Sequence, residues 1–404
     1  MTPRPAPPEA YAAALAALPG IGPARLLELV RRGPLAKEWA AVCAGGSGCE
    51  GGDGSDDPGD EPAAAFAVPR PAGNRSGAAQ ARAARRVDVA GRWRELRGAG
   101  IGVTYLGAAD YPPRLRDDPS PPAVLFWRGD LGVLERDAVA VVGTRRATGY
   151  GRGVAHRIAH DLSGEGLCVV SGLALGIDGA AHEGALAARP GWTAGVAASG
   201  VDVPYPRRHA GLWDRVIDRG VVVSETGPGH PAQPWRFPAR NRIIAGLVRA
   251  VVVVESHARG GSLHTVDAAA ERGIDVLVVP GPVTSPASEG TNQLLRDGRA
   301  PVRHARDVLD ELGRFPAWSG GSPPPAASGG AHRLDETTRA VLDAVDWTPT
   351  ATAVVAERTG LGMGPLGVVL VRLESWGVLR GRDGWWERAG DAPRRARGED
   401  ERMV

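Results

Sequence analysis

At 404 residues the chain is too long for one ordinary hydrophobic core, so two or three domains are expected. Hydrophobic residues make up 43% and charged residues 23% of the sequence, which are ordinary values for a soluble globular protein. The net charge of +2 does not by itself indicate a nucleic-acid partner, so such a partner would need a local basic patch.

The cysteines and the apolar runs exclude several classes of protein. Cys43, Cys49 and Cys168 form no CxxC pair and no cluster with histidine, so neither a zinc site nor a disulfide framework is supported. The apolar stretch Tyr11–Leu18 lacks the charged start and the cleavage site of a signal peptide, and runs such as Val251–Val254 are too short to cross a bilayer. We therefore expect a cytoplasmic protein without metal, cofactor or membrane contact.

The chain opens on short predicted helices over residues 10–42. Leu18–Leu27 reads LPGIGPARLL and matches the helix-hairpin-helix loop, in which glycines let backbone N–H groups face a phosphate at a helix start. A glycine-rich turn in a helical docking domain explains the same residues equally well, so both interpretations stay open. Residues 44–80 then lose periodicity and are rich in Gly, Ser, Asp and Pro, which predicts a disordered insertion.

Short β-branched runs alternate with helix-like stretches from Ala138 onward. Runs that are apolar on both faces and separated by helices predict a buried parallel sheet with right-handed crossovers. The predicted strands are Ala138–Val142, Leu167–Val170, Thr193–Ala197, Val221–Ser224, Val251–Glu255 and Val276–Val279.

The loops that follow these strands are the places to look for a site, because ligands bind beyond the carboxyl ends of parallel strands. The first loop, Gly143–Gly151, is not GxGxxG, so no dinucleotide fingerprint is present. Its small residues ahead of a helix predict an anion nest, to which Arg145 adds a fixed cation. The second loop, Ser171–Asp178, is also built of small residues, and Ser171 can donate a hydrogen bond.

Phe237–Leu247 is the strongest candidate for phosphate binding. Arg240 and Arg242 bracket Asn241 ahead of an apolar helix, and a planar guanidinium suits phosphate oxygens. A salt-bridged surface turn is the alternative. The later Arg259–Thr265 segment offers another helix-start nest, and several nests along one edge indicate a polyanion.

No convincing nucleophile–base pair or metal cluster accompanies these loops, so we expect no catalytic residue. Asp178 and His182 lie four residues apart on a predicted helix, and capping or bracing is favoured over catalysis. A nucleotide phosphoribohydrolase with a related sheet would need a Glu shortly after its glycine-rich loop, where Gly260–Ala268 offers only Asp267. That enzyme and a nucleotide-binding sensor remain the alternatives.

Taken in order, these blocks closely resemble the DprA/Smf family of DNA-processing proteins. The resemblance covers roughly residues 105–312. Its blocks are GTR…YG (Gly143–Gly151), SGLALGIDGAAHEGAL (Ser171–Leu186), GVDVPYP (Gly200–Pro206), SETGPG (Ser224–Gly229), FPARNRIIAGL (Phe237–Leu247), GGSLHT and VVPGP. The resemblance implies an extended Rossmann-like domain that forms a homodimer and binds single-stranded DNA without catalysis. It also implies a partner, the recombinase RecA, which the family loads onto incoming strands during natural transformation.

The resemblance also implies which residues bind DNA. They are Gly143, Thr144, Arg145, Ser171, Gly172, Arg240, Asn241, Arg242, Gly261 and Ser262. The chain departs from the family where it reads GGSLHTV (Gly260–Val266), since the family commonly has SGSL–TA there. The missing first serine puts one hydrogen bond in doubt.

The tail predicts a third small domain. Helices are expected over Glu336–Val345, Thr350–Thr359 and about Pro365–Trp376, and Asp383-Gly384 is a strong hairpin signal. Three helices and a hairpin make a winged helix, which the family often carries. Its third helix has few basic residues, so a protein-docking or accessory role is favoured over duplex reading.

The expected organisation is an α/β protein built around the parallel sheet. In order, the segments are a helical SAM-like or helix-hairpin-helix-like domain over 1–118 with the insertion at about 44–80, a Rossmann-like DNA-binding domain over 119–312, a linker over 313–332, a winged-helix domain over 333–390 and a disordered tail over 391–404.

Overall fold

The computed structural model describes residues 6–45, 77–313, 335–346, 349–376, 378–382 and 384–388. These residues divide into two compact units. Met1–Thr148 and Ala155–Gly313 make up the larger unit, and the smaller one is built mainly on the residues from Asp335 on. The predicted tail and the predicted linker, apart from Gly313, lie outside the described residues.

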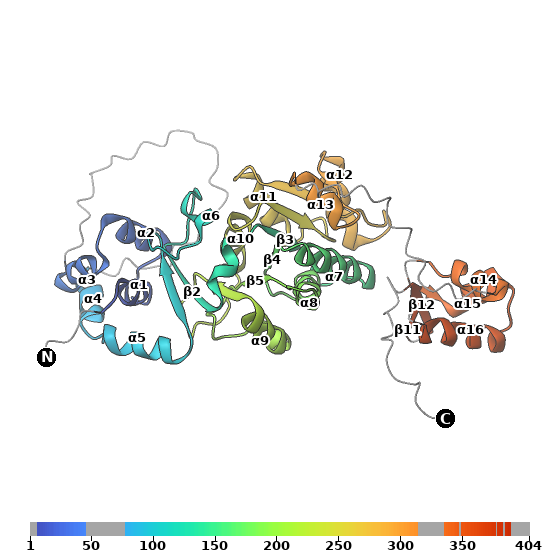
Figure 1. The fold of residues 1–404 in the computed structure, drawn as a ribbon, viewed down its shortest axis with the longest axis horizontal. Helices are drawn as coiled ribbons and strands as arrows, with labels where there is room; N and C mark the ends of the chain where they lie inside the picture. Colours follow the sequence, from blue (N-terminus) through green and yellow to red (C-terminus); the bar gives the residue numbers. More distant parts are fainter. Residues whose placement is uncertain are drawn as a thin grey trace, which may run out of the picture. The chain divides into compact units, whose positions relative to one another are not determined.

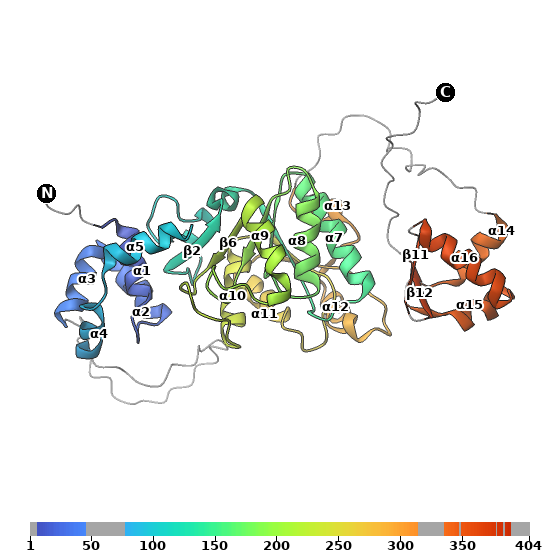
Figure 2. The ribbon, with the colours of Figure 1, turned by 90° about the horizontal axis from the view of Figure 1, so that it is seen from below.

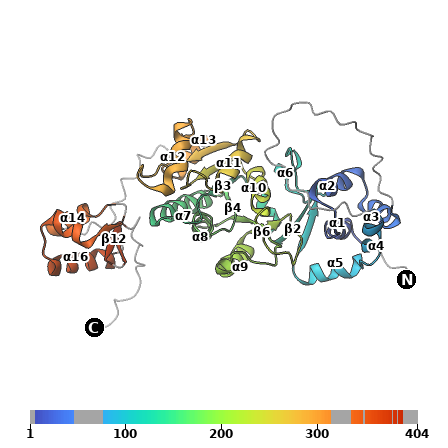
Figure 3. The same ribbon diagram turned by 180° about the vertical axis from the view of Figure 1, so that it is seen from behind.

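The larger unit begins with helices that pack onto one end of its sheet (Figures 1 and 3). They are α1 (Pro8–Ala16), α2 (Pro23–Arg32), α3 (Leu35–Ala44), α4 (Gly77–Ala84) and α5 (Val89–Gly98). Prolines in the first turn suit the starts of α1 and α2, because a first-turn N–H has no partner within the helix. Leu15, Leu29 and Trp39 join one apolar cluster with Phe126 and Val222 of the sheet, so these helices share a core with it.

Two sequence-based boundaries change in this region. Helix α4 begins at Gly77, inside the stretch predicted to be disordered, so the prediction is wrong for residues 77–80. Residues 46–76 lie outside the described residues. Strand β1 (Gly102–Tyr105) falls within the predicted helical domain but pairs with β2 (Val124–Gly129), so the sheet starts earlier than predicted.

The described residues form a nine-stranded sheet in the order β1-β2-β6-β5-β4-β3-β7-β8-β9. From β6 to β9 the strands are parallel, and β2 joins β6 in the antiparallel sense. The parallel strands are β3 (Ala138–Val142), β4 (Cys168–Ser171), β5 (Thr193–Val196), β6 (Val221–Ser224), β7 (Ala250–Val253), β8 (Asp275–Val278) and β9 (Ala300–Pro301). The predicted α/β class with a mostly parallel sheet is confirmed.

Helices cover both faces of this sheet, which is why its Val and Ala side chains are buried on both sides (Figures 1 and 2). On one face lie α7 (Gly149–Gly164), α8 (Ile177–Ala187) and α9 (Ala210–Arg219), and on the other lie α10 (Arg236–Gly246) and α11 (Leu263–Ala270). The remaining short helices are α6 (Pro113–Arg116), α12 (Glu289–Arg296) and α13 (Ala305–Glu311). The strand order reverses between β3 and β7, so the topological switch point lies there.

The smaller unit has helices on one side of a three-stranded sheet of order β10-β12-β11. Its elements are α14 (Glu336–Ala344), β10 (Thr350–Ala351), α15 (Thr352–Thr359), α16 (Met363–Ser375), β11 (Leu379–Arg382) and β12 (Trp385–Arg388). Leu366, Leu370 and Leu373 of α16 fill its core, whereas Val368 and Val371 are exposed.

No single helix in the described ranges is long and apolar enough to cross a membrane. Helices α15 and α16 are together long and apolar enough, but they are bent by 110° at the break between them.

Candidate nucleic-acid interface

The candidate site lies at the edge where the parallel strands end. At the switch point, the loop after β3 contacts the loop after β7, because the Thr144 N–H donates to the Glu255 carbonyl at 2.8 Å. Gly143 is required for this approach, since a Cβ atom there would lie 2.6 Å from both the Val254 carbonyl oxygen and Ile177 Cγ1. The prediction that these loops lie at one edge of the sheet is therefore confirmed.

The anion nest predicted at the start of α7 is filled by the protein itself. The Thr148 N–H donates to Glu255 Oε2 at 2.9 Å, and the Thr148 hydroxyl donates to Oε1 at 2.5 Å. Glu255 is only 3% exposed, so its carboxylate belongs to the interior. Thr144 is also buried, and its hydroxyl oxygen accepts from the Arg146 N–H at 3.2 Å. The Glu255 carboxylate therefore occupies the donors of Thr148 that a phosphate in this loop would use.

The second loop is also structural. The Ser171 hydroxyl is buried and donates to the Val141 carbonyl at 2.7 Å, so its one donor is used within the fold. Gly172 packs against the Arg240 guanidinium, and a Cβ atom at Gly172 would lie 2.1 Å from Arg240 Nη1. The Gly172 N–H is taken by the Asp178 carboxylate at 3.1 Å. This loop thus holds the edge of the sheet together instead of facing a phosphate.

Arg240 is buried, with a relative exposure of 6%, and its Nη1 donates to the Val196 carbonyl. Burial lowers the pKa of the guanidinium to about 10, and the negative charge of Asp178 opposes that shift. The Arg240 guanidinium therefore faces the interior, whereas a phosphate contact would need it at the surface. The reason is helical register, because α10 begins at Arg236 and places Arg240 on the same buried side as Ile243 and Ile244.

Arg242 forms a salt bridge, which is the alternative that the sequence left open. Its Nη2 donates to both carboxylate oxygens of Glu225, at 2.8 and 2.7 Å, and its Nη1 donates to the Ser120 carbonyl at 2.7 Å. The Arg242 side chain is only 20% exposed. The guanidinium is thus already held by a carboxylate, and phosphate binding by Arg242 stays a prediction.

The remaining predicted residues divide between buried and exposed positions. Asn241 is buried and its amide lies 3.4 Å from the Gly261 carbonyl, while the buried Ser262 hydroxyl donates to Ser256 at 2.9 Å. Gly261 itself is exposed, with open space where a side chain would be. Of the three arginines predicted to bind DNA, Arg145 is the one that remains exposed.

Exposed arginines lie along the same edge of the sheet. Within the described ranges, no carboxylate forms an ion pair with any of them. They are Arg145 and Arg146 after β3, and Arg207 and Arg208 after β5. Their positive charge is therefore available to a polyanion.

Aromatic side chains accompany these arginines, and a role for them in binding was not predicted from the sequence. The Arg145 guanidinium lies 4.5 Å from the centre of the Phe237 ring, and the Tyr205 ring is 5.6 Å from Phe237. Trp235 lies beneath Arg236, at 5.0 Å. Tyr205 and Trp235 are 46% and 44% exposed, which is unusual for large apolar rings. The alternation Trp-Arg-Phe at residues 235–237 is the sequence pattern that could have indicated these aromatic residues.

We call this surface the arginine–aromatic face. It comprises Arg145, Arg146, Tyr205, Arg207, Arg208, Trp235, Arg236 and Phe237. Cations that contact phosphates and rings that stack on bases are together typical of proteins that bind single-stranded nucleic acid.

Asp178 and His182 brace the fold, as expected. Asp178 is buried and accepts N–H groups of its own loop, and burial raises the pKa of its carboxyl group. His182 Nδ1 lies 2.8 Å from the Thr193 hydroxyl, which itself donates to the Val169 carbonyl. The Nδ1 atom must therefore carry the proton of a neutral ring. Burial lowers the pKa of His182 to about 3, which fits that assignment.

Protonation of His182 should destabilise the larger unit below about pH 6.5. The unfolded chain has an ordinary histidine pKa near 6.5, whereas the folded pKa is about 3, so between these values the unfolded state binds one more proton. The free energy of unfolding should then fall by about 1.4 kcal/mol for each pH unit as the pH drops through this window. Urea titrations at pH 7 and pH 5 measure the slope. His182→Asn, which keeps a donor for Thr193, should remove this contribution, and equal slopes in both proteins would contradict the assignment.

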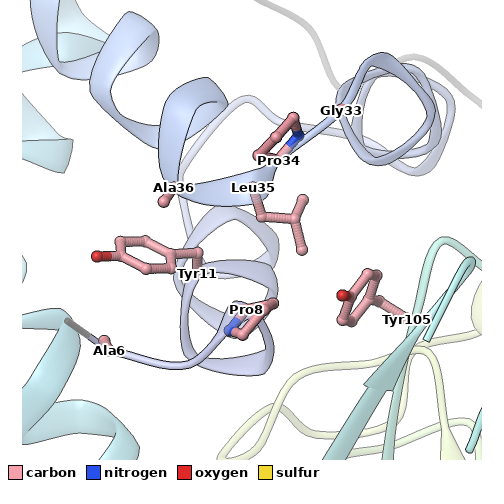
Figure 4. Close-up of a pocket in the computed structure, with 8 residues that line it drawn as sticks. All are labelled: Ala6, Pro8, Tyr11, Gly33, Pro34, Leu35, Ala36 and Tyr105. Carbon is pink, nitrogen blue, oxygen red and sulfur yellow. The ribbon is translucent and has the colours of Figure 1, made fainter. Parts of the chain in front are cut away.

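Two cavities lie away from the arginine–aromatic face. One, of about 150 Å³, lies between α1, the start of α3 and β1, where Tyr11, Leu35 and Tyr105 are among its lining residues (Figure 4). Its lining carries no cation, so it does not suit a phosphate. The other is lined by residues of α7, α8 and α9, including His156, Glu183 and Arg215. No group of three or more metal-ligating side chains occurs in the part of the chain that the structure describes.

Comparison with known proteins gives a consistent result. Residues 102–313 match the family of DNA recombination-mediator protein A. A putative DNA processing protein DprA from Mycobacterium tuberculosis is 40% identical over 292 residues, which cover 70% of this chain and 73% of that protein. Protein Smf from Escherichia coli is 35% identical over 284 residues, covering 69% and 75%. The X-ray structure of DNA processing protein A from Streptococcus pneumoniae matches with a TM-score of 0.60 and 31% identity, over 74% of this chain and 96% of that one.

Proposed function

Because the chain belongs to the DNA recombination-mediator protein A family and is a DNA-processing protein, we propose that it binds single-stranded DNA along the arginine–aromatic face. The observation that carries the proposal is the alternation of exposed rings with arginines that have no carboxylate partner among the described residues. This face lies at the edge of the sheet where ligands of parallel-sheet proteins bind.

The chemistry of the face favours a single strand over a duplex. A ring can stack only on a base whose face is free, and each such stack contributes about 1–3 kcal/mol. In a duplex the base faces are covered by their neighbours, so only the arginine–phosphate contacts would remain. Arginine–phosphate contacts are independent of sequence, so little sequence preference is expected.

We predict tighter binding to single-stranded than to duplex DNA of the same sequence, with little dependence on sequence. If all four exposed arginines of the β3 and β5 loops contact phosphates, the log–log slope of affinity against salt should be near −3, from about −0.7 for each contact. Fluorescence anisotropy with labelled oligonucleotides at several salt concentrations measures both quantities. Equal or tighter binding to duplex would contradict the proposal.

A nucleotide-sensing or nucleotide-hydrolysing role is the competing proposal. It is disfavoured because the Glu255 carboxylate occupies the nest that a nucleotide phosphate would use. In the same anisotropy experiment, adenosine monophosphate should not displace the oligonucleotide. Incubated with the protein, it should also not be hydrolysed. Turnover that disappears in Asp267→Ala would favour the enzyme instead.

The family resemblance supports a wider role. We propose that a homodimer protects incoming single strands in the cytoplasm and loads the RecA recombinase onto them during transformation or recombination. RecA filament formation on DNA covered by single-strand-binding protein tests loading, and sedimentation measures the oligomeric state. Failure to accelerate filament formation would argue against the loading role without affecting the binding proposal.

The smaller unit is proposed to be a winged helix with an accessory, protein-docking role. Its helix α16 exposes Met363, Val368 and Val371, and the one basic residue of this helix, Arg372, is accompanied by Glu374. An apolar, nearly uncharged face does not suit the phosphates of a DNA groove.

A further inference from the structure

We propose that Glu255 is a positioning residue for DNA binding, which holds the Thr144–Thr148 loop so that Arg145 is presented to the strand. This inference rests on the proposed function, because it assigns a role to a residue that does not itself touch DNA.

Glu255 contacts both ends of the loop that carries the exposed arginines. Its backbone carbonyl accepts the Thr144 N–H at 2.8 Å, and its carboxylate accepts the N–H and the hydroxyl of Thr148 at 2.9 and 2.5 Å. Arg145 and Arg146 lie between these two anchor points and are exposed. One buried residue in the loop after the neighbouring strand β7 therefore holds both the start and the end of the arginine loop.

The backbone conformation of Glu255 indicates that its side chain is needed at this position. Its φ of 58° is in the left-handed region, and Leu173, in the loop after β4, is the other non-glycine residue with positive φ in the described part of the chain. Glycine would adopt this conformation without strain, whereas a residue with a Cβ atom is disfavoured there. Strained positions of this kind persist only where surrounding contacts determine them, and they gather at functional sites.

The location of the Glu255 carboxylate explains why a DNA phosphate would bind at Arg145 and not at the N-terminus of α7. The N-terminus of a helix attracts anions, and parallel-sheet proteins often place a ligand phosphate there. Thr148 immediately precedes α7, and its N–H is occupied by Glu255. A phosphate of DNA would therefore meet the exposed Arg145 guanidinium over the Phe237 ring instead. Arg145 can be pre-oriented only if its loop is held, which is what the two anchors provide.

The test compares Glu255→Gly and Glu255→Gln by oligonucleotide anisotropy. Glycine suits the backbone at this position and removes only the side chain, so the protein should fold, as thermal melts would show. Single-strand affinity should fall about tenfold, and the salt slope should lose about 0.7, the value of one phosphate contact. Glutamine should retain affinity within about twofold, because its amide oxygen can accept the Thr148 N–H while its NH2 donates to the Thr148 hydroxyl.

A double-mutant cycle with Arg145→Ala shows whether Glu255 acts through Arg145. In the Arg145→Ala background, Glu255→Gly should change affinity by less than about twofold, since the contact that it positions is already gone. An equal loss in both backgrounds, an unchanged salt slope, or a Glu255→Gln variant as weak as Glu255→Gly would each overturn the inference while the proposed function stands. If Arg145→Ala alone leaves affinity unchanged, the proposed face itself is wrong, and this inference falls with it.

Discussion

Replacing Arg240 with alanine should destabilise the larger unit by about 3–5 kcal/mol, because the buried Asp178 carboxyl would lose the nearby positive charge that most favours its ionised form. The guanidinium also donates to the Val196 carbonyl and fills the space beside Gly172, so the variant loses a hydrogen bond and leaves a cavity. Urea unfolding monitored by circular dichroism measures the change, with an unchanged dependence on denaturant indicating that the transition stays two-state.

The double variant Arg240→Ala/Asp178→Asn provides the control. Removing the charge of Asp178 removes the buried unpaired carboxylate, so the double variant should be more stable than Arg240→Ala alone. DNA affinity should fall in Arg240→Ala only to the extent that folded protein is lost. A fully stable Arg240→Ala variant with weakened DNA binding would show that the guanidinium reaches DNA after all.

The architecture of the sheet could be predicted from sequence because its signal is local. Runs such as Ala138–Val142 and Val221–Ser224 are apolar on both faces, and both coincide with observed strands. The antiparallel strands β1 and β2 were missed, since Gly102–Tyr105 is short and mixes glycine and threonine with apolar residues. Strand β2 joins the parallel strands through β6, which lies about one hundred residues later in the chain.

The side-chain directions at the candidate site could be predicted only in part. Arg240 lies three, four and seven residues before Ile243, Ile244 and Leu247, which is the spacing of one helix face, so its burial could have been inferred once α10 was extended back to Arg236. The partner of Arg242 could not be inferred in this way, because Glu225 lies 17 residues earlier, in the loop between β6 and α10. Ion pairs between secondary-structure elements depend on tertiary geometry, and the periodicity of apolar residues in the sequence contains no information on it.

The same limit explains why the Glu255 contact escaped the sequence analysis. The residues of the loop after β3 do have the composition of an anion nest. What they bind is a carboxylate from the loop after the neighbouring strand β7, and neighbours in a parallel sheet are far apart in sequence. A nest of small residues predicts that an anion is bound, but it does not say whether that anion is a ligand or a side chain of the same chain.

Arg145→Ala should weaken binding of single-stranded DNA by about tenfold or more. Its guanidinium is exposed, has no carboxylate partner in the described ranges, and stacks over Phe237, so a phosphate contact would be formed without reorganising the side chain. A charge-assisted contact contributes roughly 1.5–3 kcal/mol, which corresponds to this loss of affinity. The loss should be the same for all sequences, and the salt slope should fall by about 0.7.

Two matched variants make this experiment decisive. Arg94→Ala removes an exposed arginine from α5, away from the face, and should leave affinity unchanged. Arg145→Lys keeps the charge but loses the planar group that lies over Phe237, so its affinity should fall between those of the wild type and Arg145→Ala. If a well-folded Arg145→Ala/Phe237→Ala variant binds as tightly as the wild type, the DNA path must lie elsewhere. The loop between α1 and α2, with Gly20 in the left-handed conformation, would then be the next surface to test.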